Sequence, residues 1–301
     1  MALVAGIDCG TNSIRLIIAD REEVGAPLNV RTREMRIVRL GEGIDKTGQF
    51  APAALERTFA ATEEYAQIIS EYGVDKIRFV ATSASRDAKN RDEFFTGIKE
   101  RLGVIPEVIS GDEEATLSFS GATASFKDED EPVLLVDIGG GSTEFVLGKR
   151  GKVIDTISTN MGSVRVFERY LAPVIADAKR GDGSLDPRQT PGMAKALIKA
   201  TSAIDELIDE ADRKLGLDRA RTLIGVAGTV TTITAHALGL EEYQPEKIHG
   251  SRIPPAQMLS SCNWMMNQPV TARDCPRVYA HRTRRCYRRR CAGVGYELSN
   301  G

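Results

Sequence analysis

The chain has 301 residues, which suggests about two domains at roughly 150 residues each. Hydrophobic residues make up 42% and charged residues 27%, an ordinary globular composition that excludes a disordered chain. No apolar run approaches the ~18 residues that a membrane span needs, and the first residues lack the basic region of a signal peptide. We therefore expect a cytoplasmic protein with no membrane partner.

The net charge of −2 is unevenly distributed along the chain. Residues 273–301 contain eight Arg and two acidic residues, a balance of +6, which leaves −8 for residues 1–272. Such an acidic body is not suited to non-specific nucleic-acid binding, so no nucleic-acid partner is expected. The five Cys fit a reducing compartment better than a disulfide scaffold.

Hydrophobic periodicity predicts alternating strands and helices in the first part of the chain. The predicted strands are 2–8, 14–19, 31–40, 76–81 and 107–110, and the predicted helices are 52–72, 92–102 and 112–126. This order is typical of an α/β domain. The charged residues 127–132 are interpreted as a linker, which predicts an N-terminal domain over 1–126 and a C-terminal domain over 127–301.

The second part of the chain repeats this pattern. Its predicted strands are 133–137, 144–147, 153–158 and 221–227, its predicted helices are 193–214 and 229–238, and a polar stretch covers 180–191. Residues 6–18 align without gaps on residues 135–147, and both segments read strand, Asp, turn, Ser and strand. A repeat at this distance predicts two similar domains that face each other across a cleft.

The turn after the first strand combines backbone N–H groups with short polar side chains. It contains Thr11, Asn12 and Ser13, and Arg15 follows two residues later, where it can share a face with Ser13. Such a loop can surround phosphate oxygens, and Asp8 at the strand end could orient a metal-bound water. An ordinary hairpin turn would use the same residue types.

The matching turn in the second half is richer in glycine. It reads Gly139, Gly140, Gly141, Ser142 and Thr143. Successive glycines let the backbone approach a ligand closely. Asp137 and Glu144 bracket this turn, and carboxylate oxygens of this kind suit Mg²⁺, which also binds substrate phosphate. The alternative is a glycine-rich loop with two solvated acids.

Three further segments carry polar groups at the ends of predicted strands. Gly228 and Thr229 start a helix whose N–H groups form an anion site, and Arg86 could hold a phosphate through two hydrogen bonds. Glu113 and Glu114 start another helix, where acids favour the helix dipole but could also orient a water for attack on phosphorus. Spacing alone does not choose between these two acids.

Together these segments resemble the exopolyphosphatase and guanosine pentaphosphate phosphohydrolase family over about residues 3–272. The segments are GIDCGTNSIRLIIAD, ATSASRDAKN, VISGDEEA, LLVDIGGGSTEFVLG, NMGSVR and GVAGTVTT. That family belongs to the actin, sugar kinase and Hsp70 superfamily. The resemblance implies two ribonuclease H-like α/β domains with mixed sheets flanked by helices, and an active site in the cleft between them.

The resemblance also implies an enzyme that removes terminal orthophosphate from inorganic polyphosphate or guanosine pentaphosphate with Mg²⁺. K⁺ is a candidate stimulating ion, and a homodimer fits the resemblance. Glu114 would be the general base, with Glu113 as the second candidate. Asp137 and Glu144 would place the metal and the water, and Asp8 is a further metal candidate. The implied phosphate-binding residues are Thr11, Asn12, Ser13, Arg15, Arg86, Gly139, Gly140, Gly141, Ser142, Thr143, Gly228 and Thr229.

Within the family, the short body without a helical extension favours polyphosphate as the substrate. Two functions outside hydrolysis remain open from the sequence. A kinase of the same superfamily would need an adenosine pocket, which no segment indicates. A non-catalytic sensor would bind polyphosphate or guanosine tetraphosphate without turnover.

The tail departs from the family pattern, because residues 275–291 replace a glycine-rich segment with a stretch that has almost no apolar periodicity. We hypothesise a disrupted reading frame near Asp274, which resequencing would test. The alternatives are a basic arm for polyphosphate or nucleic acid and a zinc site. The zinc ligands would be Cys275, His281, Cys286 and Cys291, whose spacing matches no common zinc module.

Overall fold

The structure, a computed structural model, describes residues 2–23, 26, 28–124, 131–178 and 190–267. These residues group into two units, Met1–Ser110 and the chain from Gly111 onward. Most of the predicted linker 127–132 and of the polar stretch 180–191 lies outside the described residues, as does the whole tail 273–301 with its candidate zinc ligands. No described helix is both long enough and apolar enough to cross a membrane.

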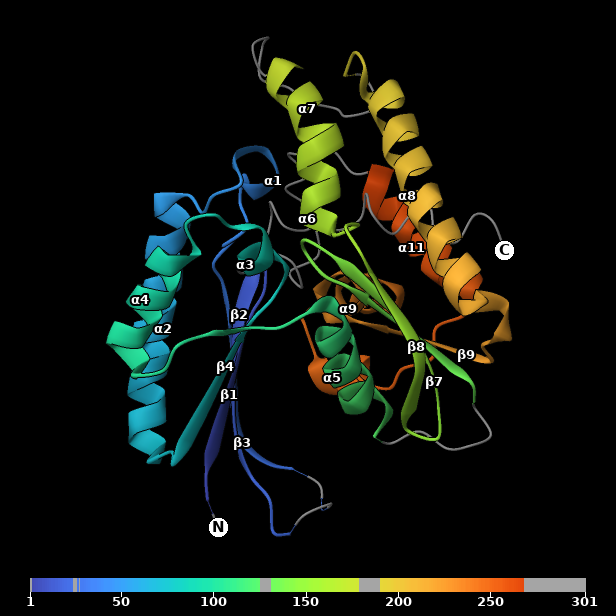
Figure 1. Cartoon of the computed structure of the whole chain (residues 1–301). Coiled ribbons are helices and arrows are strands. Elements are labelled where there is room, and N and C mark those ends of the chain that lie inside the picture. The colour runs from blue at the N-terminus through green and yellow to red at the C-terminus, as the bar shows by residue number, and fades with distance from the viewer. Residues whose placement is uncertain (1, 24–25, 27, 125–130, 179–189, 268–301) are drawn as a thin grey trace. The chain divides into compact units, whose positions relative to one another are not determined.

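The first unit is built on a five-stranded mixed sheet in the order β3-β2-β1-β4-β5 (Figure 1). β1 runs antiparallel to β2 and parallel to β4. The strands are β1 (Val4–Cys9), β2 (Ser13–Asp20), β3 (Asn29–Ile37), β4 (Lys76–Ala81) and β5 (Glu107–Val108), and the helices are α1 (Ile44–Thr47), α2 (Pro52–Tyr72), α3 (Ser83–Asp87) and α4 (Arg91–Leu102).

Strand alternation separates a core face from a polar face in this sheet. Ala5, Ile7 and Cys9 of β1 join the apolar core that also contains buried residues of α2 and α4. Burial raises the pKa of the Cys9 thiol, which therefore packs as a small apolar group and is no nucleophile. Asp8, between Ile7 and Cys9, consequently lies on the opposite face.

The second unit is built on a four-stranded mixed sheet in the order β8-β7-β6-β9 (Figure 1). The strands are β6 (Val133–Ile138), β7 (Thr143–Lys149), β8 (Lys152–Thr159) and β9 (Thr222–Val226). The helices are α5 (Gly111–Thr123), α6 (Ser163–Val166), α7 (Ala172–Ala178), α8 (Met193–Leu215), α9 (Ala227–Ala237), α10 (Pro245–Ile248) and α11 (Pro255–Asn267), with a π-helical segment Phe167–Leu171 between α6 and α7.

β6 is buried on both faces. Leu134, Val136 and Ile138 pack in the core that α8, α9 and α11 share, whereas Val133 and Leu135 pack on the opposite face. This arrangement explains why the sequence of β6 reads as a continuous apolar run instead of alternating. Two separate cores therefore hold β6, one of the two inner strands of the second sheet.

Helix α5 covers the second of these faces through Ala115 and Phe119. The Phe119 ring lies on Gly148 of β7, where a Cβ would come within 2.1 Å of the ring. Because of this packing, the contacts place α5 with the second sheet and divide the chain after Ser110. The sequence-based boundary at residue 126 instead assigns this helix to the first domain, and that boundary stays a prediction.

The two sheets follow the same plan, as the internal repeat predicted. In each unit the first two strands form a hairpin, and the first strand pairs in parallel with a later one. Gly10 N–H donates to the Ser13 carbonyl and Gly139 N–H to the Ser142 carbonyl, both at 3.0 Å. The predicted fold class, mixed α/β sheets flanked by helices, is confirmed, while the cleft between the domains stays a prediction.

Replacing Gly148 with Ala tests the docking of α5. The added methyl group would overlap the Phe119 ring, so we expect Gly148→Ala to lower the thermal midpoint, at a cost of about 1–3 kcal/mol. The matched control is Gly121→Ala on the exposed side of α5, where nothing lies within 4 Å of a new Cβ. That variant should be neutral or more stable by up to about 1 kcal/mol. Equal midpoints for both variants, measured by calorimetry, would contradict the packing described here.

Candidate functional site

The hairpin turn of the first unit holds three buried polar side chains. Thr11, Asn12 and Ser13 are only 6%, 7% and 9% exposed. Thr11 Oγ1 is buried with no hydrogen-bond partner among the described residues. A buried hydroxyl without a partner costs free energy, so this turn has hydrogen-bonding capacity that an oxygen-rich ligand could use.

The carbonyl groups of the same turn are bonded to the segment that follows β3. Gly41 N–H donates to the Thr11 carbonyl at 2.9 Å, and the Val38 and Arg39 N–H groups donate to the Asn12 carbonyl at 3.1 and 3.0 Å. These bonds explain why β3 ends at Ile37, whereas periodicity extended the strand to residue 40. The backbone leaves the sheet here to bond to the turn.

Arg15 and Asp8 face each other across the β1–β2 pair. Arg15 Nη1 lies 3.6 Å from Asp8 Oδ2, and both side chains are more than two-fifths exposed. The guanidinium group compensates the charge of this carboxylate. Asp8, predicted as a metal ligand, therefore already has a cationic neighbour.

Arg86 lies on α3, directly after β4. Its Nη1 donates to the Ile109 carbonyl at 2.9 Å, which ties α3 to the chain two residues before α5 begins. The predicted contact of Arg86 with phosphate remains a prediction. Arg86 lies five residues beyond the end of β4, whereas Gly228 and Thr229 lie only two and three residues beyond the end of β9 in the second unit.

The second unit places Asp137 and Glu144 opposite each other on β6 and β7. Asp137 follows Leu135 by two residues and Glu144 precedes Val146 by two, so both carboxylates lie on the face that α5 covers. Glu144 is 1% exposed and accepts hydrogen bonds from the Ser142 hydroxyl and, at 2.8 Å, from Ser158 Oγ.

This burial changes the acidity of Glu144. Its pKa is raised to about 8, first by loss of solvent and then by the negative charges of Glu114 and Asp137, while the two serine hydrogen bonds act in the opposite direction. Like charges directly opposite each other in a sheet are unfavourable. The set of Glu114, Asp137 and Glu144 therefore favours binding of a cation or a proton.

Helix α5 brings Glu114 to these carboxylates. Glu114 is half-buried and its charge acts on Glu144, whereas the neighbouring Glu113 is exposed. One turn further on, Ser118 Oγ donates to Asp137 Oδ2 at 2.6 Å. The structure therefore brings Glu114, rather than Glu113, to the carboxylate pair.

Two serines of this cluster were missed from the sequence, and both had a detectable signal. Ser118 follows Glu114 by four residues, so the two share a helix face. Ser158 is the cross-strand neighbour of Glu144 on β8. Gly111 lies against Ser158, where a Cβ would come within 2.5 Å of the serine Cβ, so only glycine lets α5 start this close to the strand.

The remaining predicted residues of this unit lie around the same carboxylates. Val226 pairs with Asp137, which places Gly228 and the buried Thr229 at the start of α9 just beyond the end of β6. Ala227, which links Val226 to Gly228, has a φ of 69°, an unusual value for a residue with a Cβ. Thr143 is fully buried, and its hydroxyl donates to the Met161 carbonyl at 2.8 Å. The hydroxyl proton of Thr143 is therefore already engaged in a hydrogen bond within the protein.

Asp137 and Glu144 fit the donor set that Mg²⁺ uses in phosphate-processing sites, which is one or two carboxylates, waters and substrate oxygens. The observation that supports this fit is the pairing of two acids, Asp137 half-buried and Glu144 buried, directly across the sheet. Across the described ranges, no group of three or more His, Cys, Asp or Glu side chains is arranged to hold a metal by itself. Asp8 belongs to the first unit and is not one of the acids that act on Glu144.

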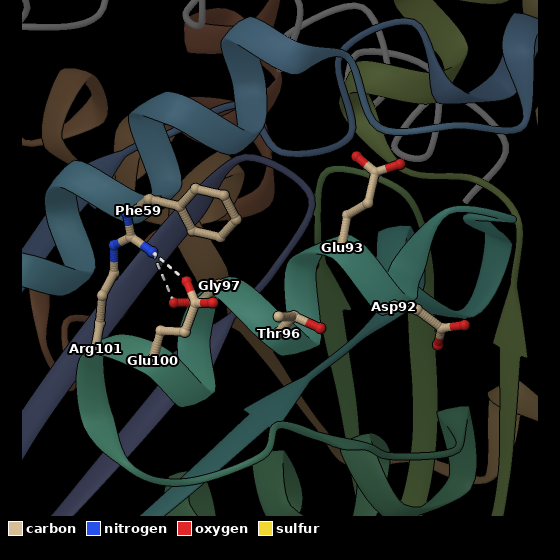
Figure 2. A pocket seen from close by; sticks show the side chains of 7 residues that line it. All are labelled: Phe59, Asp92, Glu93, Thr96, Gly97, Glu100 and Arg101. Carbon is tan, nitrogen blue, oxygen red and sulfur yellow. Dashed lines mark hydrogen bonds and ion pairs between the residues drawn. The ribbon is translucent and has the colours of Figure 1, made fainter.

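A surface depression on α2 and α4 of the first unit contains none of the predicted site residues. Figure 2 shows its lining: Phe59, Asp92, Glu93, Thr96, Gly97, Glu100 and Arg101. Three of these side chains are acidic, and the guanidinium of Arg101 lies over the Phe59 ring at 4.5 Å. Such a surface repels a polyanion, so we do not connect it with phosphate chemistry.

The pKa of Glu144 predicts how the metal-free protein depends on pH. The folded state keeps the Glu144 proton up to about pH 8, whereas the unfolded chain releases it near 4.5, so stability should fall as pH rises between these values. In EDTA, Glu144→Gln should reduce this fall in melting temperature by at least about 4 °C. Glu113→Gln is the exposed control and should melt like the wild type. An equally steep fall in Glu144→Gln would contradict the assigned burial.

Known proteins are similar to this chain in sequence. "Exopolyphosphatase 2" of Mycobacterium tuberculosis is 42% identical over 269 residues, which cover 86% of this chain and 78% of that protein. A "bifunctional 3-dehydroquinate synthase/phosphatase" of Fusobacterium nucleatum is 36% identical over 259 residues, covering 83% of this chain and 36% of that protein.

Solved structures agree with these relatives. The crystal structure of an exopolyphosphatase-like protein superposes with a TM-score of 0.82 at 42% identity, over 99% of this chain and 86% of the other. The Aquifex aeolicus PPX-GPPA enzyme gives a TM-score of 0.75 at 28% identity, over 99% of this chain and 91% of the other. The sequence model of the Ppx/GppA phosphatase family matches residues 17–283. The resemblance seen in the sequence is thus confirmed, and the chain belongs to the Ppx/GppA phosphatase family.

Proposed function

We propose that this protein is an exopolyphosphatase that releases orthophosphate from the end of inorganic polyphosphate. The observation that carries the proposal is the carboxylate cluster of Glu114, Asp137 and Glu144, which Ser118 and Ser158 hold in place. The 42% identity to a protein named exopolyphosphatase supports polyphosphate as the substrate class and does not favour guanosine pentaphosphate.

Hydrolysis of a phosphoanhydride needs an oriented water and positive groups around the phosphate oxygens. In our proposal the water oxygen attacks the terminal phosphorus, and Glu114 accepts the proton that the water loses. The bond from phosphorus to the bridging oxygen breaks, and this oxygen leaves with the shortened chain. Glu114 suits the role of base because it is half-buried beside the other two acids. It lies in the first turn of α5, which starts against Ser158 near the end of β8.

Backbone N–H groups are the proposed holders of the phosphate oxygens. They come from the turn with Thr11 and Asn12, from the glycines 139–141 and from the start of α9 at Gly228. N–H groups aimed at a phosphate stabilise the charge of the transition state without further reorganisation. Arg15 and Arg86 would add charged donors to the first turn.

Asp137 and Glu144 are the residues that would hold Mg²⁺ in this proposal. The bound ion supplies positive charge that offsets the negative charge on the phosphate oxygens. Ser118 and Ser158 fix the two carboxylates for this purpose, since each donates its hydroxyl proton to one of them. A potassium requirement and a dimeric state are further expectations that activity and size measurements would test.

Substitution of the proposed base is the decisive test of the reaction. Glu114→Gln keeps the size of the side chain but cannot accept a proton, so kcat for orthophosphate release should fall by about 10²–10⁴-fold. Glu113→Gln is the matched control, because Glu113 is the adjacent exposed acid, and its kcat should stay within about threefold of wild type. Release is measured on polyphosphate of defined lengths and on guanosine pentaphosphate.

Several results would overturn parts of this proposal. A large loss in Glu113→Gln with none in Glu114→Gln would move the base to Glu113. Faster release from guanosine pentaphosphate than from polyphosphate would exchange the substrate. A folded wild type that binds polyphosphate tightly without releasing orthophosphate would be a sensor.

The metal assignment has its own pair of variants, supplied by the internal repeat. Asp137→Asn removes a carboxylate from the like-charged pair and should raise the Mg²⁺ concentration for half-maximal activity by at least about tenfold. Asp8→Asn changes the equivalent residue of the first unit, whose carboxylate faces Arg15, and should leave this concentration unchanged. EDTA should abolish activity in all three proteins. A higher Mg²⁺ requirement in Asp8→Asn alone would place the metal in the first unit.

A further inference from the structure

The carbonyl groups of the glycine turn in the second unit are bonded by one short segment that follows β8, residues 162–165. Ser163 N–H donates to the Gly139 carbonyl at 3.0 Å, and the N–H groups of Val164 and Arg165 donate to the Gly140 carbonyl at 2.9 and 3.1 Å. Arg165 also uses its side chain, because its Nε donates to the Gly141 carbonyl at 2.7 Å.

We infer that residues 162–165 form a carbonyl clamp that orients the glycine turn for phosphate, and that Arg165 is the positioning residue in it. The inference rests on the proposed function only in that the ligand is a phosphate group. Gly162 and Arg165 belong to the NMGSVR segment of the resemblance, but neither was given a role from the sequence.

The physical basis is the geometry of the peptide group. The C=O and N–H groups of a trans peptide point in opposite directions. Holding the carbonyls of glycines 139–141 toward the clamp therefore turns the N–H groups of the following residues, Gly140, Gly141 and Ser142, away from it. Without the clamp, carbonyl oxygens could rotate toward the ligand side, where they would repel an anion.

Arg165 is suited to this role by its burial and charge. Only 9% of it is exposed, and its guanidinium places a positive charge behind the turn while its Nε bonds to the last glycine carbonyl. Hydrogen bonds from a charged donor are stronger than neutral ones. The clamp therefore holds the turn through a buried donor that carries a charge.

Gly162 permits the close approach of the two segments. A Cβ on this residue would lie 2.3 Å from the carbonyl carbon and oxygen of Gly140 and from the carbonyl carbon of Gly141. These are backbone atoms that cannot move aside cheaply. The clamp therefore requires glycine at its start.

The first unit contains the same arrangement, which argues that it is more than local packing. There the segment after β3 donates N–H groups to the Thr11 and Asn12 carbonyls, and Gly41 approaches Thr11 so closely that a Cβ would lie 2.4 Å from its methyl group. That turn offers side chains to a ligand, whereas glycines 139–141 offer only backbone. The arginine side chain, that of Arg165, contacts the turn in which glycines 139–141 have only backbone N–H groups to bind a ligand.

The test follows phosphate binding and activity in Arg165→Met, with Arg101→Met as the matched control. Arg101 also donates to a glycine carbonyl, that of Gly97 at 2.9 Å, but it lies on α4 beside Phe59, on the depression of the first unit (Figure 2). Orthophosphate is titrated into the full-length protein labelled with ¹⁵N-glycine, and the amide shifts of Gly140 and Gly141 report its binding.

We expect Arg165→Met to weaken orthophosphate binding and raise KM for polyphosphate by about tenfold or more, while Arg101→Met leaves both within about twofold. Arg165→Lys keeps the charge and one donor, so its KM should lie between those of wild type and Arg165→Met. If Arg165→Met does not fold, the test uses Arg165→Lys alone, which should show a raised KM for polyphosphate and weaker orthophosphate binding than the wild type.

Other outcomes would overturn the inference. One is a lowered melting temperature in the Arg165 variants with unchanged orthophosphate binding and KM, which would make the arginine purely structural. Another is a wild type in which orthophosphate does not move the Gly140 and Gly141 amides. Failure of the proposed function looks different: polyphosphate is not hydrolysed, yet orthophosphate moves these amides in the wild type and not in Arg165→Met.

Discussion

Glu144 lies almost fully out of solvent and directly across the sheet from Asp137, and the charge of Glu114 acts on it from helix α5. Acidic groups do not gather in this way without compensation, since burial and mutual repulsion both oppose ionisation. Much of the second unit serves this cluster. Ser158 and Ser118 donate hydroxyl protons to it, and Gly111 lets α5 start beside β8. The alternation of side chains along β6 and β7 places the Asp137 and Glu144 carboxylates on one face of the sheet.

The internal repeat shows how one backbone plan acquired two different electrostatic environments. At the equivalent positions of the two hairpins, the first unit pairs Asp8 with Arg15 and the second pairs Asp137 with Glu144. A single position, arginine in one unit and glutamate in the other, changes a neutral pair into one that attracts cations. The turns differ as well, because Gly140 and Gly141 of the second unit stand at the positions of Thr11 and Asn12 in the first.

Most of the sheets followed from the sequence, because a strand that is buried on one or both faces leaves a clear apolar pattern. Elements whose ends depend on single contacts could not be predicted from the sequence. The four-residue helix α6 has no periodicity to detect, and β3 ends where its backbone bonds to Asn12 and not where its pattern ends. The choice between Glu113 and Glu114 likewise depended on which side of α5 meets the sheet. The basic tail lies outside the described residues, so its alternatives stand as predicted.

The burial of β6 on both faces also fixes the position of the Asp137 carboxylate. Asp137 lies within a strand that packs against apolar cores on both faces, between the buried residues Val136 and Ile138. The carboxylate therefore takes its rigidity from side chains that never meet a ligand. A change of packing in either core therefore displaces the strand together with its carboxylate, so we expect core substitutions that touch no ligand to disturb the site as well.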